Sequence, residues 1–118
     1  MVDVVATDEF EAWYLSLAAG EQDSVDFVVG LLQDRGVTLG FPHSSAIKGA
    51  SVALRELRVT GRQPLRVFYA FDPRRAAVLL IGGDKTGDDR FYETMIRVAE
   101  KIWEQYLAEQ ARGEHEEP

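Results

Sequence analysis

Residues 77–92 read AVLLIGGDKTGDDRFY. Four large apolar residues, Val78–Ile81, run into Gly82 and Gly83 and then into a loop that carries five charged side chains. An apolar run of this kind predicts a strand that is covered on both faces, and we expect the two glycines to let the backbone bend sharply at its end. A charged loop at the end of a strand is a common location for a binding or catalytic site. The alternative interpretation is a solvated turn that leads into the next helix.

Two segments upstream of this strand also have the character of strands. Val52–Val59 mixes apolar and charged residues at near-alternating spacing, and Pro64–Phe71 places β-branched and aromatic residues on one face. The links TGRQ and DPRR between the three segments are short and turn-like, so we expect an antiparallel meander. Val2–Val5 is either a further short strand or an ordered lead-in.

Two helices are predicted ahead of the sheet. Asp8 and Glu11 form a plausible capping box, and the apolar residues that follow recur at helical spacing until Gly20. A second helix is predicted over residues 22–34, with Gly36 as its C-terminal cap.

A last helix is predicted over residues 89–111, because a wide apolar stripe recurs along it. Residues 112–118 are polar and acidic, and we expect them to form a flexible tail. The sequence therefore predicts one α+β domain over residues 1–111. We expect two N-terminal helices, a small antiparallel sheet of three to four strands and a C-terminal helix.

The composition excludes several classes of protein. The 118 residues include 46% hydrophobic and 28% charged residues, as in an ordinary soluble globular domain. The chain has no cysteine and only two histidines, which excludes disulfides, thiolate metal sites and a cysteine nucleophile, and we expect no metal and no cofactor. No apolar run is long enough to cross a membrane, and the N-terminus has no secretion signal, so we expect a cytoplasmic protein that binds no membrane.

The net charge of −7 is distributed unevenly along the chain. Residues 1–41 and 84–118 are acidic, with net charges of −7 and −5, whereas residues 42–83 hold seven basic and two acidic residues and have a net charge of +5. A local basic patch matters more than the net charge for binding a phosphate. The alternative is that these arginines only keep one face of a sheet soluble.

A nucleotide-binding P-loop is excluded by spacing, although a strand, glycines, Lys-Thr and a helix follow one another. The motif needs a glycine directly before the lysine and another where Leu79 stands, whereas Asp84 precedes Lys85. An acidic residue in the cradle would also repel a triphosphate.

Several segments together resemble a known family. ALRELRV (53–59), PLRVFYAFD (64–72) and AVLLIGGDKTGDDRFYE (77–93), followed by a helix ending in IWEQYL, resemble the RelE/HigB toxins of bacterial type II toxin–antitoxin systems. The resemblance is strongest to their phage-related HigB-like branch and covers about Phe10 to Leu107. It implies a RelE-like fold, similar to that of small microbial ribonucleases, in which a sheet packs against helices.

The resemblance also implies an activity and partners. It implies a ribosome-dependent mRNA endoribonuclease, or mRNA interferase, that acts on the ribosome and its mRNA and inhibits translation. The implied partner is a helix-turn-helix antitoxin encoded nearby, which neutralises the toxin. Operator DNA is expected to be bound only through the complex with the antitoxin.

The family motifs can be carried over residue by residue. Arg66 matches the arginine of the Arg-Val strand, and Arg55 and Arg58 match those of the Leu-Arg-Glu-Leu-Arg segment. Lys85 occupies the basic position after the last strand, where related toxins place a catalytic residue, and Lys48 loosely matches an upstream lysine that contacts RNA. We expect Lys85 to join Arg66 and one of the other two arginines around a single phosphate.

The chemistry explains why these residue types are needed. The ribose 2′-hydroxyl attacks the adjacent phosphate, and arginine forks stabilise the charge that builds up on its oxygens. Proton transfer requires an acid–base group, for which Lys85 and Asp84 are candidates, and His43 is a third if its loop folds over the sheet. The predicted catalytic residues are Lys85, Arg66, Arg58 and Asp84, and the predicted RNA-binding residues are Arg55, Lys48 and His43.

Structural interpretations of the arginines remain open. Glu56 is expected to pair with a neighbouring arginine, in which case Arg55 or Arg58 is structural, and Arg66 lies between apolar residues, where a paired arginine would fix strand packing. Because the chain is acidic overall, a second hypothesis is a non-catalytic module that keeps the toxin fold and binds an antitoxin-like protein without cleaving RNA.

Overall fold

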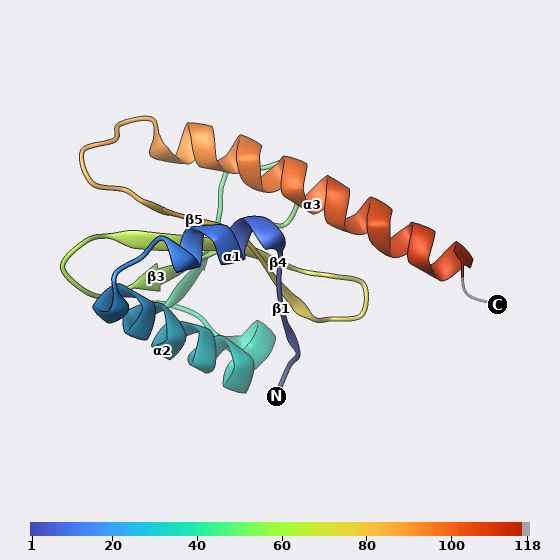
Figure 1. Cartoon of the computed structure of the whole chain (residues 1–118), viewed down its shortest axis with the longest axis horizontal. Coiled ribbons are helices and arrows are strands. Elements are labelled where there is room, and N and C mark those ends of the chain that lie inside the picture. The colour runs from blue at the N-terminus through green and yellow to red at the C-terminus, as the bar shows by residue number, and fades with distance from the viewer. Residues whose placement is uncertain (117–118) are drawn as a thin grey trace.

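The computed structural model describes residues 1–116, with side chains described as far as residue 113. One helical layer, formed by α1 and α2, lies on one side of a sheet, and α3 lies on the other side (Figure 1). The elements along the chain are β1 (Val4–Ala6), α1 (Asp8–Leu15), α2 (Ala19–Arg35), the 3-10 helix η1 (Gly36–Thr38), β2 (Ser44–Ala46), β3 (Arg55–Val59), β4 (Leu65–Phe71), β5 (Ala77–Asp84) and α3 (Phe91–Glu116).

Five strands form one mixed sheet in the order β1-β5-β4-β3-β2. The meander of β3, β4 and β5 is antiparallel, as the sequence predicts. The sheet has one strand more than the three to four expected, because β2 adds to β3, and its β1–β5 pair is parallel rather than antiparallel. Strands β1 and β2 have three residues each, which is too short for an alternating pattern to be visible in the sequence.

The prediction that β5 is covered on both faces is confirmed. Val78 and Leu80 pack in the core beneath α3, whereas Ala77 and Leu79 pack in the core beneath α1 and α2. The register between β4 and β5 shifts at one point, because Leu79 pairs with Tyr69 whereas Ile81 pairs with Phe68. Leu80 therefore has no partner residue in β4 and forms a bulge.

The glycines at the end of β5 do not bend the backbone, so that prediction is wrong. Gly82 and Gly83 lie inside the strand, and the positive φ of the following turn, 65°, belongs to Gly87. A Cβ atom on Gly82 would lie 2.3 Å from Trp13 Cζ3, and one on Gly83 would lie 2.9 Å from Phe91 Cε1. The glycines therefore allow α1 on one face and α3 on the other to pack closely on β5.

Thr7 is the N-terminal cap of α1. The predicted capping box of Asp8 and Glu11 is therefore wrong. Thr7 Oγ1 accepts a hydrogen bond from the Phe10 N–H at 3.2 Å. The same hydroxyl lies 2.9 Å and 3.0 Å from the carbonyl oxygens of Leu79 and Leu80, to which it donates. Thr7 therefore joins the beginning of α1 to the bulge of β5.

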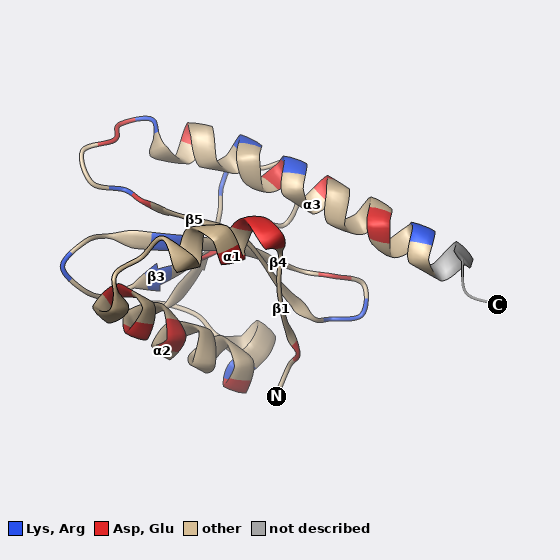
Figure 2. Ribbon diagram, in the orientation of Figure 1, with Lys and Arg blue, Asp and Glu red and all other residues tan. Residues whose placement is uncertain are grey.

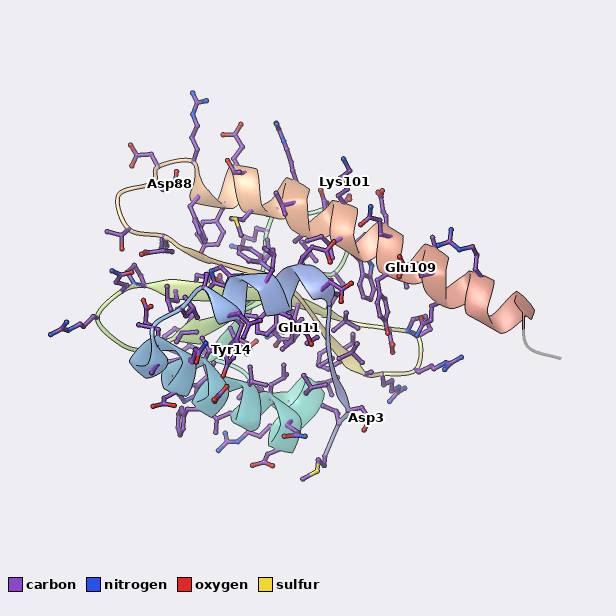
Figure 3. The ribbon with its side chains drawn as sticks, viewed as in Figure 1. Asp3, Glu11, Tyr14, Asp88, Lys101 and Glu109 are labelled. Atoms are coloured by element: carbon purple, nitrogen blue, oxygen red, sulfur yellow. The ribbon has the colours of Figure 1, made fainter. Side chains whose placement is uncertain are left out.

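Helix α2 begins three residues earlier than predicted and ends at Gly36, whose φ of 54° confirms its role as the C-terminal cap. Tyr14 connects the two N-terminal helices, because its hydroxyl donates a 2.8 Å hydrogen bond to Asp26 Oδ1; Figure 3 shows Tyr14 between α1 and α2. The two acidic helices α1 and α2 are thus joined in one layer.

Helix α3 begins two residues later than predicted and runs to Glu116, beyond the expected end at residue 111. The predicted tail, residues 112–118, therefore begins inside this helix, and its last two residues lie outside the described part of the chain. Figure 1 shows the C-terminal half of α3 projecting beyond the sheet. Within residues 1–116, no helix has the length and apolar character needed to cross a membrane.

A buried carboxylate attaches the β4–β5 turn to α3. Asp72 accepts hydrogen bonds from the Tyr106 hydroxyl at 2.9 Å and from Gln110 Nε2 at 3.2 Å. Its other oxygen accepts the backbone N–H groups of Arg74 and Ala76, both at 2.9 Å. Burial alone would raise the pKa of Asp72, but these four hydrogen bonds outweigh burial and lower it below its ordinary value.

Candidate functional site

Two arginines stand directly opposite each other at one end of the central strands. Arg58 of β3 pairs with Arg66 of β4, and Arg66 in turn pairs with Gly83 of β5. Because side chains alternate along a strand, both arginines lie on the face of Phe68, which packs beneath α3. Like charges directly across a sheet repel each other, so an anion nearby would stabilise this arrangement.

Glu56 supplies part of that negative charge. Its Oε1 lies 3.2 Å from Arg66 Nε, in an ion pair whose N–H does not point at the carboxylate well enough to form a hydrogen bond. The same oxygen accepts a 2.6 Å hydrogen bond from the Tyr92 hydroxyl of α3, and Oε2 accepts one of 3.3 Å from Ser45 Oγ of β2. Glu56 is 5% exposed and the Arg66 side chain is 15% exposed. The arginine that pairs with Glu56 is thus Arg66, rather than Arg55 or Arg58.

Arg58 has no acidic partner among the residues whose side chains are described. Its Nη2 donates a 3.2 Å hydrogen bond to Ser45 Oγ, and its Cζ lies 5.5 Å from the centre of the Phe41 ring. Its Nε is buried and has no hydrogen-bond partner. An unpaired buried N–H costs about 1–3 kcal/mol, and no carboxylate among the described side chains neutralises the charge of this guanidinium.

Lys85 lies next to the Arg66–Glu56 pair. Its backbone N–H donates a 3.1 Å hydrogen bond to the Pro64 carbonyl, which holds the start of the loop against β4. Its Nζ lies 5.4 Å from the centre of the Tyr92 ring, and Tyr92 binds Glu56. Burial and the hydrogen bond with Glu56 raise the pKa of Tyr92, so its hydroxyl remains protonated and acts as a donor.

Arg58 and Arg66, which pair across β3 and β4, and Lys85, which lies over the Tyr92 ring, form what we call the cation cluster, and among the described side chains only Arg66 has an ion pair with Glu56. Figure 2 shows basic residues on β3, both basic and acidic residues in the loop before α3, and mainly acidic residues on α1 and α2. Rigid strands that carry excess positive charge are suited to bind an anion, and an arginine fork fits two phosphate oxygens. In the described part of the chain, no three His, Asp or Glu side chains come together as a metal site would require.

Arg55 is not part of the cation cluster, because it lies on the opposite face of the sheet. Its Nη2 and Nε donate hydrogen bonds of 3.1 Å and 3.3 Å to Ser44 Oγ, and Nε lies 3.3 Å from the hydroxyl oxygen of the buried Tyr69. Of the two arginines that sequence reasoning left open, Arg58 is the one that lies beside Arg66.

The other predicted site residues lie around the cluster. Asp84 is exposed, stands opposite Leu65 on the other face of the sheet, and accepts a 2.9 Å hydrogen bond from the Thr86 N–H that shapes the turn. Lys48 is exposed in the loop between β2 and β3. The His43 carbonyl accepts a 2.8 Å hydrogen bond from the Arg58 N–H, so the loop before β2 lies beside β3.

Sequence reasoning missed Phe41, Ser45 and Tyr92 as parts of the site. Ser45 and Tyr92 contact Glu56, and Phe41 contacts Arg58. Phe41 could have been identified from the sequence, because a large aromatic residue inside a Gly/Pro loop has no strand or helix to bury it. The roles of Ser45 and Tyr92 depend on β2 and on the docking of α3, which the sequence does not specify.

A hollow of about 500 Å³ lies away from the cation cluster, between the N-terminal part of α2 and the β3–β4 turn. Its lining includes Val59 and Leu65, which belong to the core on the α1–α2 side of the sheet. Glu21 and Arg62 are its charged residues, and they balance each other. This hollow therefore lacks the excess positive charge that the cation cluster carries.

A solved structure shares this fold. The E. coli toxin RelE, solved in its free state as a double arginine-to-alanine mutant, superimposes with a TM-score of 0.59 over 81% of this chain and 96% of RelE, at 7% sequence identity. The arrangement of the sheet between α1–α2 and α3 therefore defines the class of RelE-like folds.

Sequence comparisons give the family. Residues 12–104 match the family described as "Phage derived protein Gp49-like (DUF891)". Among curated proteins, "Putative toxin HigB3" of Mycobacterium tuberculosis H37Rv is 35% identical over 112 residues, which cover 93% of this chain and 97% of the relative. "Putative toxin HigB2" of the same organism is 29% identical over 106 residues, 86% of this chain and 53% of that relative. The chain belongs to the Gp49-like family and is a RelE/HigB-like toxin.

Proposed function

We propose that the cation cluster binds a phosphate of mRNA and that this chain cleaves mRNA on the ribosome. The observation that carries the proposal is the pair of opposed arginines, of which Arg58 has a buried, unpaired Nε. The names of the relatives, which are those of toxins, agree with it. Ribosomes and mRNA place this activity in the cytoplasm.

The cluster is suited to the attack of a ribose 2′-hydroxyl on the adjacent phosphate. The 2′-oxygen gives its proton to solvent water and bonds to phosphorus, and the bond from phosphorus to the 5′-oxygen breaks, which leaves a 2′,3′-cyclic phosphate and a 5′-hydroxyl. Arg58 and Arg66 would stabilise the negative charge that builds up on the phosphate oxygens. Glu56 and Tyr92 would orient Arg66, and Lys85, as an ammonium group, would give a proton to the leaving 5′-oxygen.

The residues around the cluster have subordinate roles in this proposal. Lys48 is exposed in the loop after β2, and we propose that it contacts the RNA backbone. His43 belongs to the loop beside Arg58, where it too would contact RNA. Asp84 shapes the loop that presents Lys85, and Arg55, on the other face of the sheet, would act only through the packing of Ser44 and Tyr69.

Lys85→Ala tests the proposed chemistry, with Lys101→Ala as the matched control. Lys101 is exposed on α3 and, as Figure 3 shows, projects from the outer side of that helix. Losing one charge aimed at the transition state should slow cleavage of mRNA in programmed ribosomes about a hundredfold and relieve growth arrest. The melting temperature of each variant is the control for folding. If Lys85→Ala stays fully toxic with an unchanged melting curve, Lys85 has no part in the chemistry.

We also propose that a helix-turn-helix antitoxin encoded beside this gene binds and neutralises the protein, and that the pair binds operator DNA. Growth after induction, with and without the neighbouring gene, tests this pairing, together with co-elution of the two purified proteins. Separate elution at micromolar concentration would show that the pairing is wrong. A wild-type chain that binds the antitoxin but never cleaves mRNA would instead support the non-catalytic binding module.

A further inference from the structure

We propose that Phe41 is a platform on which a base of the RNA stacks, next to the phosphate held by the cation cluster. The inference rests on the proposed function and adds to it the means by which the site holds a nucleotide beyond its phosphate.

The first observation is the exposure of Phe41 beside an arginine of the cluster. Phe41 is 79% exposed, although burying a phenylalanine ring is favourable by about 1.5–3 kcal/mol. Its ring centre lies 5.5 Å from Arg58 Cζ, within the range of a cation–π contact. An open aromatic ring therefore borders the guanidinium whose Nε has no partner.

The second observation is that the backbone of the loop that carries Phe41 is fixed against the sheet. The N–H groups of His43 and Ser44 both donate 3.1 Å hydrogen bonds to the Gly40 carbonyl, which closes the turn around Phe41. The Arg58 N–H donates to the His43 carbonyl, which fixes the turn against β3, and Leu39 anchors the other side in the core. Because the backbone is already ordered, stacking of a ligand on the ring costs less conformational freedom than it would on a mobile loop.

The combination of a cation and an aromatic ring indicates the class of ligand. Sites for single-stranded nucleic acid pair positive groups that hold the backbone with aromatic rings on which bases stack. In a nucleotide the base is tethered to the phosphate by one sugar, so a phosphate on Arg58 brings a base close to Phe41. The contact would tolerate any base, because every base has a π-face.

Other exposed apolar side chains do not fit this role. Leu15, Phe27 and Val37 lie on α1, α2 and η1, the acidic part of the chain, which repels RNA. Phe27 is 62% exposed and is therefore a matched control for Phe41.

The experiment measures binding of the full chain to ribosomes programmed with a short mRNA. The mRNA carries a 2′-O-methyl group at the scissile position, which prevents cleavage, and the fluorescent base 2-aminopurine beside it. Binding of the wild type should quench the fluorescence through stacking. Phe41→Leu should weaken binding about tenfold or more and abolish the quenching, Phe41→Trp should restore both, and Phe27→Leu should match the wild type.

An mRNA that lacks the neighbouring base provides an independent measurement. The wild type should bind it as weakly as Phe41→Leu binds the intact mRNA, and Phe41→Leu should lose no further affinity. If Phe41→Leu binds and quenches like the wild type while Arg58→Ala binds weakly, the inference fails and the proposed function stands. If the wild type does not bind the mRNA, both fail. If Phe41→Leu weakens only antitoxin binding, Phe41 contacts protein and the inference is overturned.

Discussion

The sequence identifies Gly82 and Gly83 as important residues, but the role that it predicts for them is wrong. Glycine before a charged loop predicts a bend, yet both glycines are in extended strand and Gly87 makes the turn. What they provide is the absence of a Cβ, since Trp13 and Phe91 occupy that space on opposite faces of β5. The sequence could not reveal this, because it depends on where α1 and α3 dock.

Gly82→Ala should therefore destabilise the fold. The new methyl group would meet the Trp13 ring at a distance that no relaxed structure allows, and a rigid ring cannot move aside as a flexible chain end can. Overpacking of this kind lowers the free energy of unfolding by about 1–3 kcal/mol. Chemical denaturation measures it.

Gly30→Ala is the matched control for that substitution. Gly30 lies inside α2, and a Cβ there would have no neighbour within 4 Å. The free energy of unfolding should rise by about 0.5–1 kcal/mol, because alanine favours the helix. Equal effects of the two substitutions would show that close packing on β5 is not the reason for Gly82.

The division of the arginines between two faces was contained in the sequence. Arg55 and Arg58 are three residues apart in one strand, and an odd separation places two side chains on opposite faces. The pairing of Arg58 with Arg66 also follows from a short turn between antiparallel strands. The ion pair of Glu56 with Arg66, in contrast, depends on Tyr92 of α3 and on Ser45 of β2. Local sequence patterns do not predict contacts between such separate elements.

At the scale of elements, the helices and strands β3 and β4 were predictable from the spacing of their apolar residues, and β5 from its continuous apolar run. β1 was one of two alternatives for Val2–Val5, and β2 was missed, since three residues carry no period; β1 also joins β5 across more than seventy residues of sequence. The bulge at Leu80 was also not predictable, because it depends on how β5 pairs with β4. Thr7 depends on this bulge, because its hydroxyl binds the Leu79 and Leu80 carbonyls.

The attachment of the β4–β5 turn to α3 predicts a pH dependence of stability. The pKa of Asp72 is lower in the folded chain than its ordinary value of 3.8, because its hydrogen bonds outweigh burial. Its stabilising contribution is therefore complete above about pH 4 and is lost as the pH falls through the folded pKa. In Asp72→Asn this loss is absent, so the wild type should lose its advantage over the variant below pH 4.

At pH 7, Asp72→Asn should lower the free energy of unfolding by about 1.5–3 kcal/mol, the range for hydrogen bonds to a charged group. Denaturation curves at several pH values measure both effects, and Asp34→Asn, at an exposed position on α2, is the control. A difference between wild type and Asp72→Asn that stays constant from pH 7 to pH 2 would contradict the assignment.

At the scale of the whole molecule, positive charge is concentrated in the middle of the chain. Residues 42–83, which include β2, β3 and β4, have a net charge of +5, whereas residues 1–41 and 84–118 have net charges of −7 and −5. The cation cluster is therefore a local positive site between acidic segments, and this local site, rather than the molecule as a whole, would attract RNA. The net charge of the chain therefore does not predict whether it binds RNA.

This distribution of charge leads to a prediction about salt. If Arg58, Arg66 and Lys85 contact phosphates of single-stranded RNA, the logarithm of the binding constant should fall with the logarithm of salt concentration with a slope of about −2. Arg58→Ala should make the slope shallower by about 0.7, since one phosphate contact is lost. Arg62→Ala should leave the slope unchanged, because Arg62 lines the hollow on the other face. Titration of a 2′-O-methyl oligoribonucleotide over a range of salt concentrations measures all three slopes. Equal slopes for wild type and Arg58→Ala would show that the phosphate lies elsewhere, whereas a reduced slope for Arg62→Ala would place RNA on the other face of the sheet instead.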